Sequence, residues 1–93
     1  MLLDLTTKVI RSKDLMIAPV DKDTVILNLA KNNYITLDAI GSRIWILTES
    51  AISVSDICHV LSFEFSGDIS NIQKDVISFL NELIDEGIMN VST

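Results

Sequence analysis

The adjacent pair Cys58-His59 combines the residue types that nucleophilic catalysis uses, a thiol and an imidazole base. In such a site the base must lie within hydrogen-bond reach of the thiol. The surrounding pattern predicts a helix, in which neighbouring side chains point about 100° apart, so the two groups diverge. We therefore expect Cys58 to be a small core or boundary residue and His59 to lie on the surface.

Metal and cofactor chemistry has no better candidates in this sequence. One His and one Cys do not supply the three or four ligands that a zinc site needs. Gly41, Gly67 and Gly87 are isolated from one another and do not form a phosphate-binding loop. The acidic residues within 81–86 follow the polar side of a predicted helix, as a solvated face does. The sequence thus predicts no catalytic site, no metal site and no cofactor, and a chain that is not an enzyme.

Composition restricts the remaining classes of function. The 93 residues are enough for one domain with one core, and an apolar content of 48% with 5% aromatic residues predicts an aliphatic core. The net charge is −6 and the seven basic residues are scattered, whereas a nucleic-acid partner requires a basic stripe.

No apolar run reaches the roughly 18–20 residues of a membrane span, and the N-terminus does not resemble a secretory signal. The single cysteine excludes an internal disulfide, so we expect reduced, cytoplasmic surroundings.

The elements that must position any binding site begin with strands, within about residues 8–37. Residues 8–20 hold two short apolar pieces before Pro19, which has no amide to donate, and we expect one strand here, bent or bulged. Residues 24–30 predict a half-buried strand, and residues 33–37 a second one joined to it by an asparagine-rich hairpin. The three strands would form an antiparallel meander.

The third of these strands forms an edge of the meander. Alternation places Ile35 and Leu37 on its core face and Tyr34 and Thr36 on its outer face. The ring of Tyr34 should therefore be partly exposed. An edge strand also presents backbone amides and carbonyls without partners, to which another extended chain can pair.

Helical periodicity follows, within about residues 38–87. Asp38 is placed to cap a first helix, which carries Trp45 as a core aromatic and ends near residues 49–50. The segment Ser53–Asp56 has the spacing of a capping box and opens a second helix, which ends near residues 63–65.

The third helix has the clearest pattern in the sequence. It starts near residues 68–70, where Ser70 and Gln73 offer a capping box, and ends at Gly87, after which residues 88–91 fold back as an extended tail. Its apolar arc spans roughly 160°, against the roughly 100° that a surface helix needs to cover a core. One margin of this helix is therefore available for a groove, unless the tail and the sheet cover it.

Four short motifs follow one another in a fixed order between residues 23 and 91. They are Tyr34-Ile-Thr-Leu-Asp38, Ile44-Trp45-Ile-Leu47, Val54-Ser-Asp-Ile57 and Val76-Ile-Ser-Phe-Leu80 with Leu83, Gly87 and Ile88. Their order and spacing resemble the PqqD family, although Asp38 replaces the usual Asn and Glu49-Ser50-Ala51 replaces a typical Asp-Gly turn. The resemblance implies one α+β domain over residues 1–93, winged-helix-like, with a three-stranded antiparallel sheet followed by three helices.

The function implied by this resemblance is that of a RiPP recognition element, which binds the leader segment of a ribosomally made precursor peptide. In the family the leader adds as a further strand beside the third strand and lies against the third helix. Main-chain hydrogen bonds then give affinity, and pockets for alternate side chains give specificity. The chain is most similar to the separate leader-binding protein of lasso-peptide biosynthesis, which presents the leader to a cysteine protease or to another tailoring enzyme.

Eight residues are the candidate peptide-binding residues on this basis. They are Asn33, Tyr34, Ile35, Thr36, Asp75, Val76, Phe79 and Glu82. Two alternatives remain: the opposite helix margin with Ile77 and Ile84 reads the peptide, or Phe79 is simply buried against the sheet.

Two other functional classes also remain open. One is a subunit that dimerises through the same sheet edge, and the other is a winged-helix DNA-binding regulator. The regulator would require basic residues on the third helix, where residues 68–86 hold one Lys against five acids.

Overall fold

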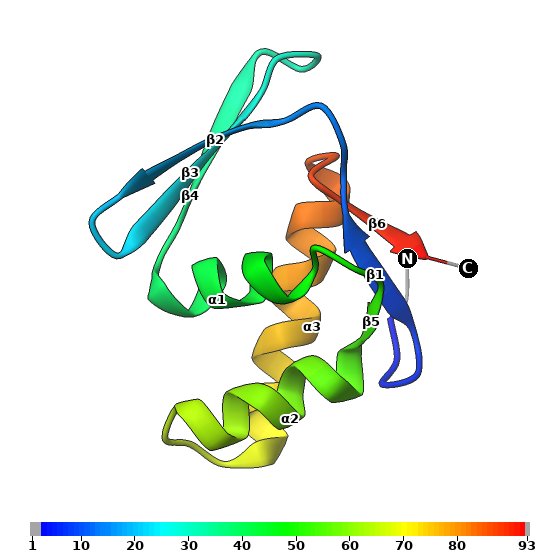
Figure 1. The fold of residues 1–93 in the computed structure, drawn as a ribbon. Coiled ribbons are helices and arrows are strands. Elements are labelled where there is room, and N and C mark those ends of the chain that lie inside the picture. The colour runs from blue at the N-terminus through cyan, green and yellow to red at the C-terminus, as the bar shows by residue number, and fades with distance from the viewer. Residues whose placement is uncertain (1–2, 93) are drawn as a thin grey trace.

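The computed structural model describes residues 3–92, which form two small sheets and three helices (Figure 1). In chain order the elements are β1 (Lys8–Arg11), β2 (Met16–Val20), β3 (Asp23–Asn28), β4 (Asn33–Leu37), α1 (Ala39–Leu47), β5 (Ile52–Ser53), α2 (Val54–Glu64), α3 (Ile69–Asp85) and β6 (Met89–Ser92).

The predicted meander is formed by β2, β3 and β4, in that order, with antiparallel pairing throughout. Both connecting turns contain a residue in the left-handed region, Asp21 at φ 57° and Asn32 at φ 54°, as tight turns of this kind favour. The register aligns Ile17, Ile26 and Ile35 in one row on the helical side of the sheet. This three-stranded sheet followed by three helices confirms the α+β, winged-helix-like fold class.

The N-terminal segment differs from the prediction, because residues 8–20 form two strands in two different sheets. The chain leaves β1 and turns at Asp14, which has φ 63°, before it enters β2. β1 pairs with β6 on one side and with the short β5 on the other, and its Val9 is fully buried. The apolar residues within 8–11 therefore belong to a second sheet, and the predicted tail at residues 88–91 forms one of its strands.

The N-terminal caps of the first two helices match the prediction, whereas the third helix starts where predicted but without the predicted capping box. The carboxylate of Asp38 accepts a hydrogen bond from the Gly41 amide (2.8 Å), and the hydroxyl of Ser53 accepts one from the Asp56 amide (3.1 Å). In α3 the Ile72 amide donates to the carbonyl of Asp68 (3.0 Å), so Asp68 is the N-cap residue. Ser70 already lies inside the helix, and the predicted capping box with Gln73 is wrong.

The end of α3 is a Schellman turn that redirects the chain into β6. Gly87 adopts φ 77°, which favours glycine, and its amide donates to the carbonyl of Ile84 (3.0 Å). The amide of Ile88 donates to the carbonyl of Leu83 (2.9 Å). The reversal brings β6 against β1 and buries Met89 completely.

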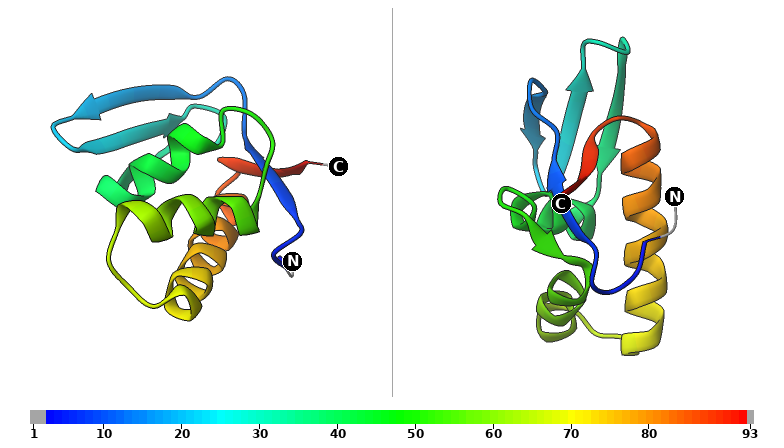
Figure 2. Two further views of the ribbon diagram at one scale, coloured as in Figure 1. Left: turned by 60° about the horizontal axis from the view of Figure 1, so that its bottom comes forward. Right: turned by 90° about the vertical axis from the view of Figure 1, so that its right-hand side faces the viewer.

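The core lies where α1, α2 and α3 meet the inner faces of the two sheets. Trp45 is only 3% exposed, as expected for a core aromatic, and the guanidinium of Arg11 lies 5.0 Å from its ring centroid. Figure 2 shows the meander projecting from one end of the molecule, with α3 running from beside it toward the opposite end. None of the helices in residues 3–92 combines the length and the apolar character needed to cross a membrane.

Candidate functional site

The Cys58-His59 pair is divided between the core and the surface. Cys58 is buried, which raises the pKa of its thiol, and His59 is exposed with its ring edge-on to Phe63 at a centroid distance of 5.1 Å. Within residues 3–92 there is no cluster of three His, Cys, Asp or Glu side chains that could hold a metal ion. Both residues take the positions expected from the sequence.

β4 forms one edge of the meander, because over the described residues it pairs with β3 alone. Its residues alternate as predicted: Ile35 and Leu37 turn inward, whereas Thr36 and Tyr34 are exposed, Tyr34 by 70%. In an antiparallel pair, every second residue directs its N–H and C=O away from the neighbouring strand. β4 therefore offers a row of backbone donors and acceptors along its free side.

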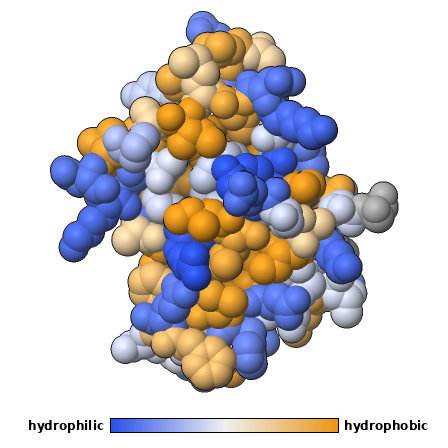
Figure 3. Space-filling view, viewed as in Figure 1, coloured by the Kyte–Doolittle hydropathy of each residue, from blue (hydrophilic) through white to orange (hydrophobic). Residues whose placement is uncertain are grey.

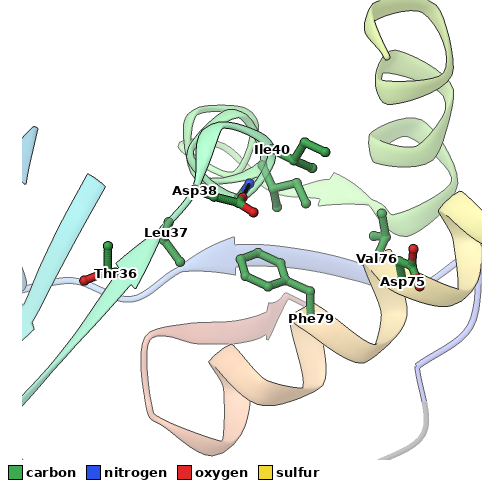
Figure 4. Close-up of a pocket in the computed structure, with 9 residues that line it drawn as sticks. Thr36, Leu37, Asp38, Ile40, Asp75, Val76 and Phe79 are labelled. Atoms are coloured by element: carbon green, nitrogen blue, oxygen red, sulfur yellow. Dashed lines mark hydrogen bonds between the residues drawn. The ribbon is translucent and has the colours of Figure 1, made fainter. Parts of the chain in front are cut away.

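A cleft of about 300 Å³ opens between the end of β4, the start of α1 and the middle of α3 (Figure 4). We call it the central pocket. Its lining comprises Thr36, Leu37, Asp38, Ile40, Gly41, Ile44, Asp75, Val76 and Phe79. The ring of Phe79 extends from α3 toward α1 and Leu37, and the walls are mainly aliphatic with two carboxylates, Asp38 and Asp75.

Gly41 permits the close approach of α1 and α3 at this pocket. A Cβ atom at Gly41 would lie 3.1 Å from Cζ of Phe79 and 3.2 Å from Cβ of Leu37. Contacts this short require the neighbouring atoms to shift. A glycine inside a helix costs about 1 kcal/mol relative to alanine, and here it leaves space for the Phe79 ring.

A second cleft, of about 350 Å³, continues along β4 toward the hairpin. We call it the acidic pocket, because Tyr34 and Ile35 of β4 face Glu82, Asp85 and Glu86 across it. The central and acidic pockets together form the β4–α3 groove.

Hydrogen bonds tie the hairpin to the C-terminal end of α3 beside the acidic pocket. The side-chain amide of Asn33 donates to Oε2 of Glu86 (2.8 Å), and Nζ of Lys31 donates to the backbone carbonyl of Asp85 (3.1 Å). The groove is therefore bounded at this end.

A third cleft, of about 230 Å³, adjoins the central pocket beyond the last residue of β4. We call it the loop pocket, because it is lined by the end of α2, the α2–α3 loop and the first half of α3. Its lining comprises Ile40, Leu61, Phe65, Ser66, Gly67, Asp68, Asn71, Ile72, Asp75 and Val76.

The helices beside the loop pocket are joined by an ion pair. Nε of Arg43 in α1 donates to Oε1 of Glu64 in α2 (2.8 Å), and its Nη2 donates to Oε2 (2.8 Å). The hydrogen bond from Arg43 lowers the pKa of Glu64. Both side chains remain about one third exposed, so this pair orients the helices more than it stabilises them.

The structure brings the candidate residues together along the groove. Tyr34, Ile35 and Glu82 line the acidic pocket, whereas Thr36, Asp75, Val76 and Phe79 line the central pocket. Asn33 closes the hairpin end through its bond to Glu86.

The two alternatives for α3 can be compared with these positions. Neither Ile77 nor Ile84 lines the three pockets, and both pack against the core. Phe79 is partly buried and lines the central pocket, so it belongs to both the core and the groove.

Sequence reasoning missed the contribution of α1. Ile40, Gly41 and Ile44 line the central pocket, but the sequence assigned this helix only to the core. The signal that could have revealed it is Gly41, since a glycine within a helical pattern often marks a close approach. The acidic residues Asp85 and Glu86 were read as a solvated face and line the acidic pocket.

Comparison with known proteins identifies two similarities. The family model described as Coenzyme PQQ synthesis protein D (PqqD) matches residues 23–89. The solved structure "TbiB1 in Complex with the TbiA(beta) Leader Peptide" is similar with a TM-score of 0.81 and 30% sequence identity, covering 90% of this chain and 98% of that chain. No curated protein sequence matches the chain.

Proposed function

This chain belongs to the PqqD family, and on that basis we propose that it binds the leader segment of a ribosomally made precursor peptide. The leader adds as a strand along the free edge of β4, and its inward side chains enter the β4–α3 groove. The domain, over residues 1–93, is a recognition element without catalytic activity of its own.

The observation that carries the proposal is the combination of a free strand edge with a groove directly beside it. An added strand needs backbone partners on one side and pockets at alternate positions on the other. β4 supplies the backbone partners, and the central and acidic pockets supply the space for side chains. The similarity to TbiB1, which was solved in complex with a leader peptide, supports leader binding by this chain.

The chemistry of the groove indicates which leader it accepts. Burying one Leu, Ile or Phe side chain in the central pocket contributes about 1.5–3 kcal/mol. Both pockets are lined by carboxylates, the central pocket by Asp75 and the acidic pocket by Glu82. A leader with an apolar anchor and a basic or polar neighbour is therefore favoured over an acidic one.

The proposed role is presentation of the leader to a separate enzyme. Cys58, the one thiol of the chain, is buried, whereas the base beside it, His59, is exposed. We propose a cytoplasmic partner enzyme, either a leader-cleaving cysteine protease, as in lasso-peptide biosynthesis, or another tailoring enzyme that acts while the domain holds the leader.

Titration with precursor segments tests the proposal. The N-terminal halves of the short peptides encoded beside the gene of this chain are synthesised, and binding is measured by calorimetry and by amide chemical shifts. We expect at least one segment to bind with shifts concentrated on β4 and α3. If every segment binds more weakly than about 1 mM, which is about −4 kcal/mol, the leader-binding function is wrong.

Two further measurements address the alternatives. The bound segment should keep its mass during incubation, and any cleavage that disappears in Cys58→Ala would contradict a non-catalytic role. Size-exclusion chromatography at several concentrations should give a monomer, whereas concentration-dependent dimers that exclude the peptide would favour a dimerising subunit.

A further inference from the structure

The β4–α3 groove is closed at one end and open at the other. At the hairpin end, Asn33 and Lys31 bond to the last residues of α3. At the opposite end the central pocket continues into the loop pocket, with which it shares Ile40, Asp75 and Val76. An occupant of the groove that extends past β4 therefore reaches the loop pocket.

The loop pocket lies where strand pairing is no longer available. β4 ends at Leu37, and the chain turns at Asp38 into α1. A strand paired along all five residues of β4 covers roughly 17 Å, the limit set by about 3.4 Å per residue. Binding beyond this point must come from side chains.

The walls of the loop pocket suit an apolar side chain with a basic neighbour. Its interior is formed by Ile40, Leu61, Phe65, Ile72 and Val76, whereas its polar lining includes the carboxylates of Asp68 and Asp75. No basic residue lines it. Figure 3, viewed as in Figure 1, shows apolar surface interrupted by charged groups over the middle of the molecule, in the region of α1 and α2.

We propose that the peptide bound by this chain continues past β4 and places an apolar anchor side chain in the loop pocket. The inference rests on the proposed leader-binding function and extends it from a five-residue pairing site to a longer recognition segment. An incoming strand antiparallel to β4, like every other pairing in the meander, runs from the α1 end toward the hairpin. The anchor therefore precedes the paired residues in the peptide, and a Lys or Arg adjoins it.

Two pairs of matched variants isolate the loop pocket from the rest of the surface. Phe65 lines it, whereas Phe63, two residues earlier, is 80% exposed and lines none of the three pockets. Asn71→Arg places a bulky cation at the mouth, and Ser70→Arg adds the same charge to an exposed neighbour outside the pockets. The arginine pair removes no core contact, so it remains informative if Phe65→Ala fails to fold.

The probe is a displayed library of random peptides of about 15 residues, whose extended reach of about 50 Å exceeds the groove. Peptides selected on the protein are synthesised in full length and without the residues that precede the paired segment. A scan with backbone N-methyl groups maps the residues that pair with β4, and an alanine scan maps the anchor. Thermal melts accompany every variant.

We expect Phe65→Ala and Asn71→Arg to weaken the full-length peptide about tenfold, the equivalent of about 1.4 kcal/mol. The shortened peptide should bind all variants alike, and the control variants should bind the full-length peptide as the unaltered protein does. Equal binding of both peptides, or an anchor that follows the paired residues, would overturn the inference while β4 pairing stands. Failure to select any peptide, or selected peptides that are insensitive to changes in β4, would instead overturn the proposed function.

Discussion

The variant Phe79→Ala tests whether Phe79 is a groove residue or a core residue, because the two roles predict different changes in stability and in peptide affinity. A fully buried phenylalanine costs about 3–5 kcal/mol when it is cut to alanine, partly through the cavity left behind. Phe79 is only partly buried and already borders the open central pocket. Its removal enlarges that pocket and creates no sealed cavity, so we expect a loss of about 2 kcal/mol in the free energy of unfolding.

The effect on binding follows from the area that the ring shares with the leader. If an incoming side chain covers about 50 Å² of the ring, its loss at about 25–30 cal/mol per Å² weakens binding by about 1.3–1.5 kcal/mol. This corresponds to an affinity about tenfold lower. Calorimetric titration with the leader and thermal denaturation of the free protein give the two quantities separately.

Two control variants on the same helix complete the test. Ile84 is also partly buried but lines none of the three pockets, so Ile84→Ala should lower stability comparably and leave affinity unchanged. Leu80 is completely buried, and Leu80→Ala should cost about 2–5 kcal/mol. A loss of 3 kcal/mol or more in Phe79→Ala with unchanged affinity, together with weaker binding in Ile84→Ala, would refute the placement of the groove on this margin.

Three further predictions concern β4, the groove carboxylates and α1. Proline at Ile35 or Thr36 removes one amide donor, and since only one of these amides points outward, one variant should stay folded and bind at least about tenfold more weakly. If neither folded variant loses affinity, the leader does not pair with β4. Asp75→Asn and Glu82→Gln should change the free energy of unfolding by no more than about 0.5 kcal/mol. Both should weaken binding of a basic leader, most strongly at low salt. A loss of affinity that is independent of salt would show that these carboxylates do not act through their charge. Gly41→Ala gains about 1 kcal/mol of helix propensity against overpacking of about 1–3 kcal/mol, so the free energy of unfolding should fall by about 0–2 kcal/mol while affinity falls as well. Unchanged affinity would show that the central pocket is not occupied.

The sequence was sufficient for the β3–β4 hairpin and the three helices because their signals are local. Asp38 and Ser53 cap helices with their own neighbours, and Gly87 ends α3 through the positive φ that it adopts. The alternation of Tyr34 and Thr36 with inward residues likewise needs only the period of a strand. For the same reason, four of the candidate residues could be placed on one edge strand from the sequence alone.

The second sheet could not be predicted because its pairing is set by distant parts of the chain. Lys8 pairs with Ser53 in β5 and with Ser92 in β6, and nothing within residues 8–20 specifies either partner. The role of Ile40 in two pockets was missed for a related reason. Its exposure of 45% depends on how α1 packs across α3, and this packing cannot be predicted from a local sequence pattern.

The two walls of the β4–α3 groove come from residues 33–37 and 69–85, so the site exists only when these two distant segments are folded against each other. A peptide that binds the folded state and not the unfolded chain raises stability through thermodynamic linkage, by about 2.7 kcal/mol at a concentration one hundred times its Kd. For a domain of this size each kcal/mol shifts the melting temperature by about 4–8 °C, which gives an increase of about 10–20 °C. Differential scanning fluorimetry can therefore rank unlabelled peptides against this protein before any contact with β4 or α3 has been mapped.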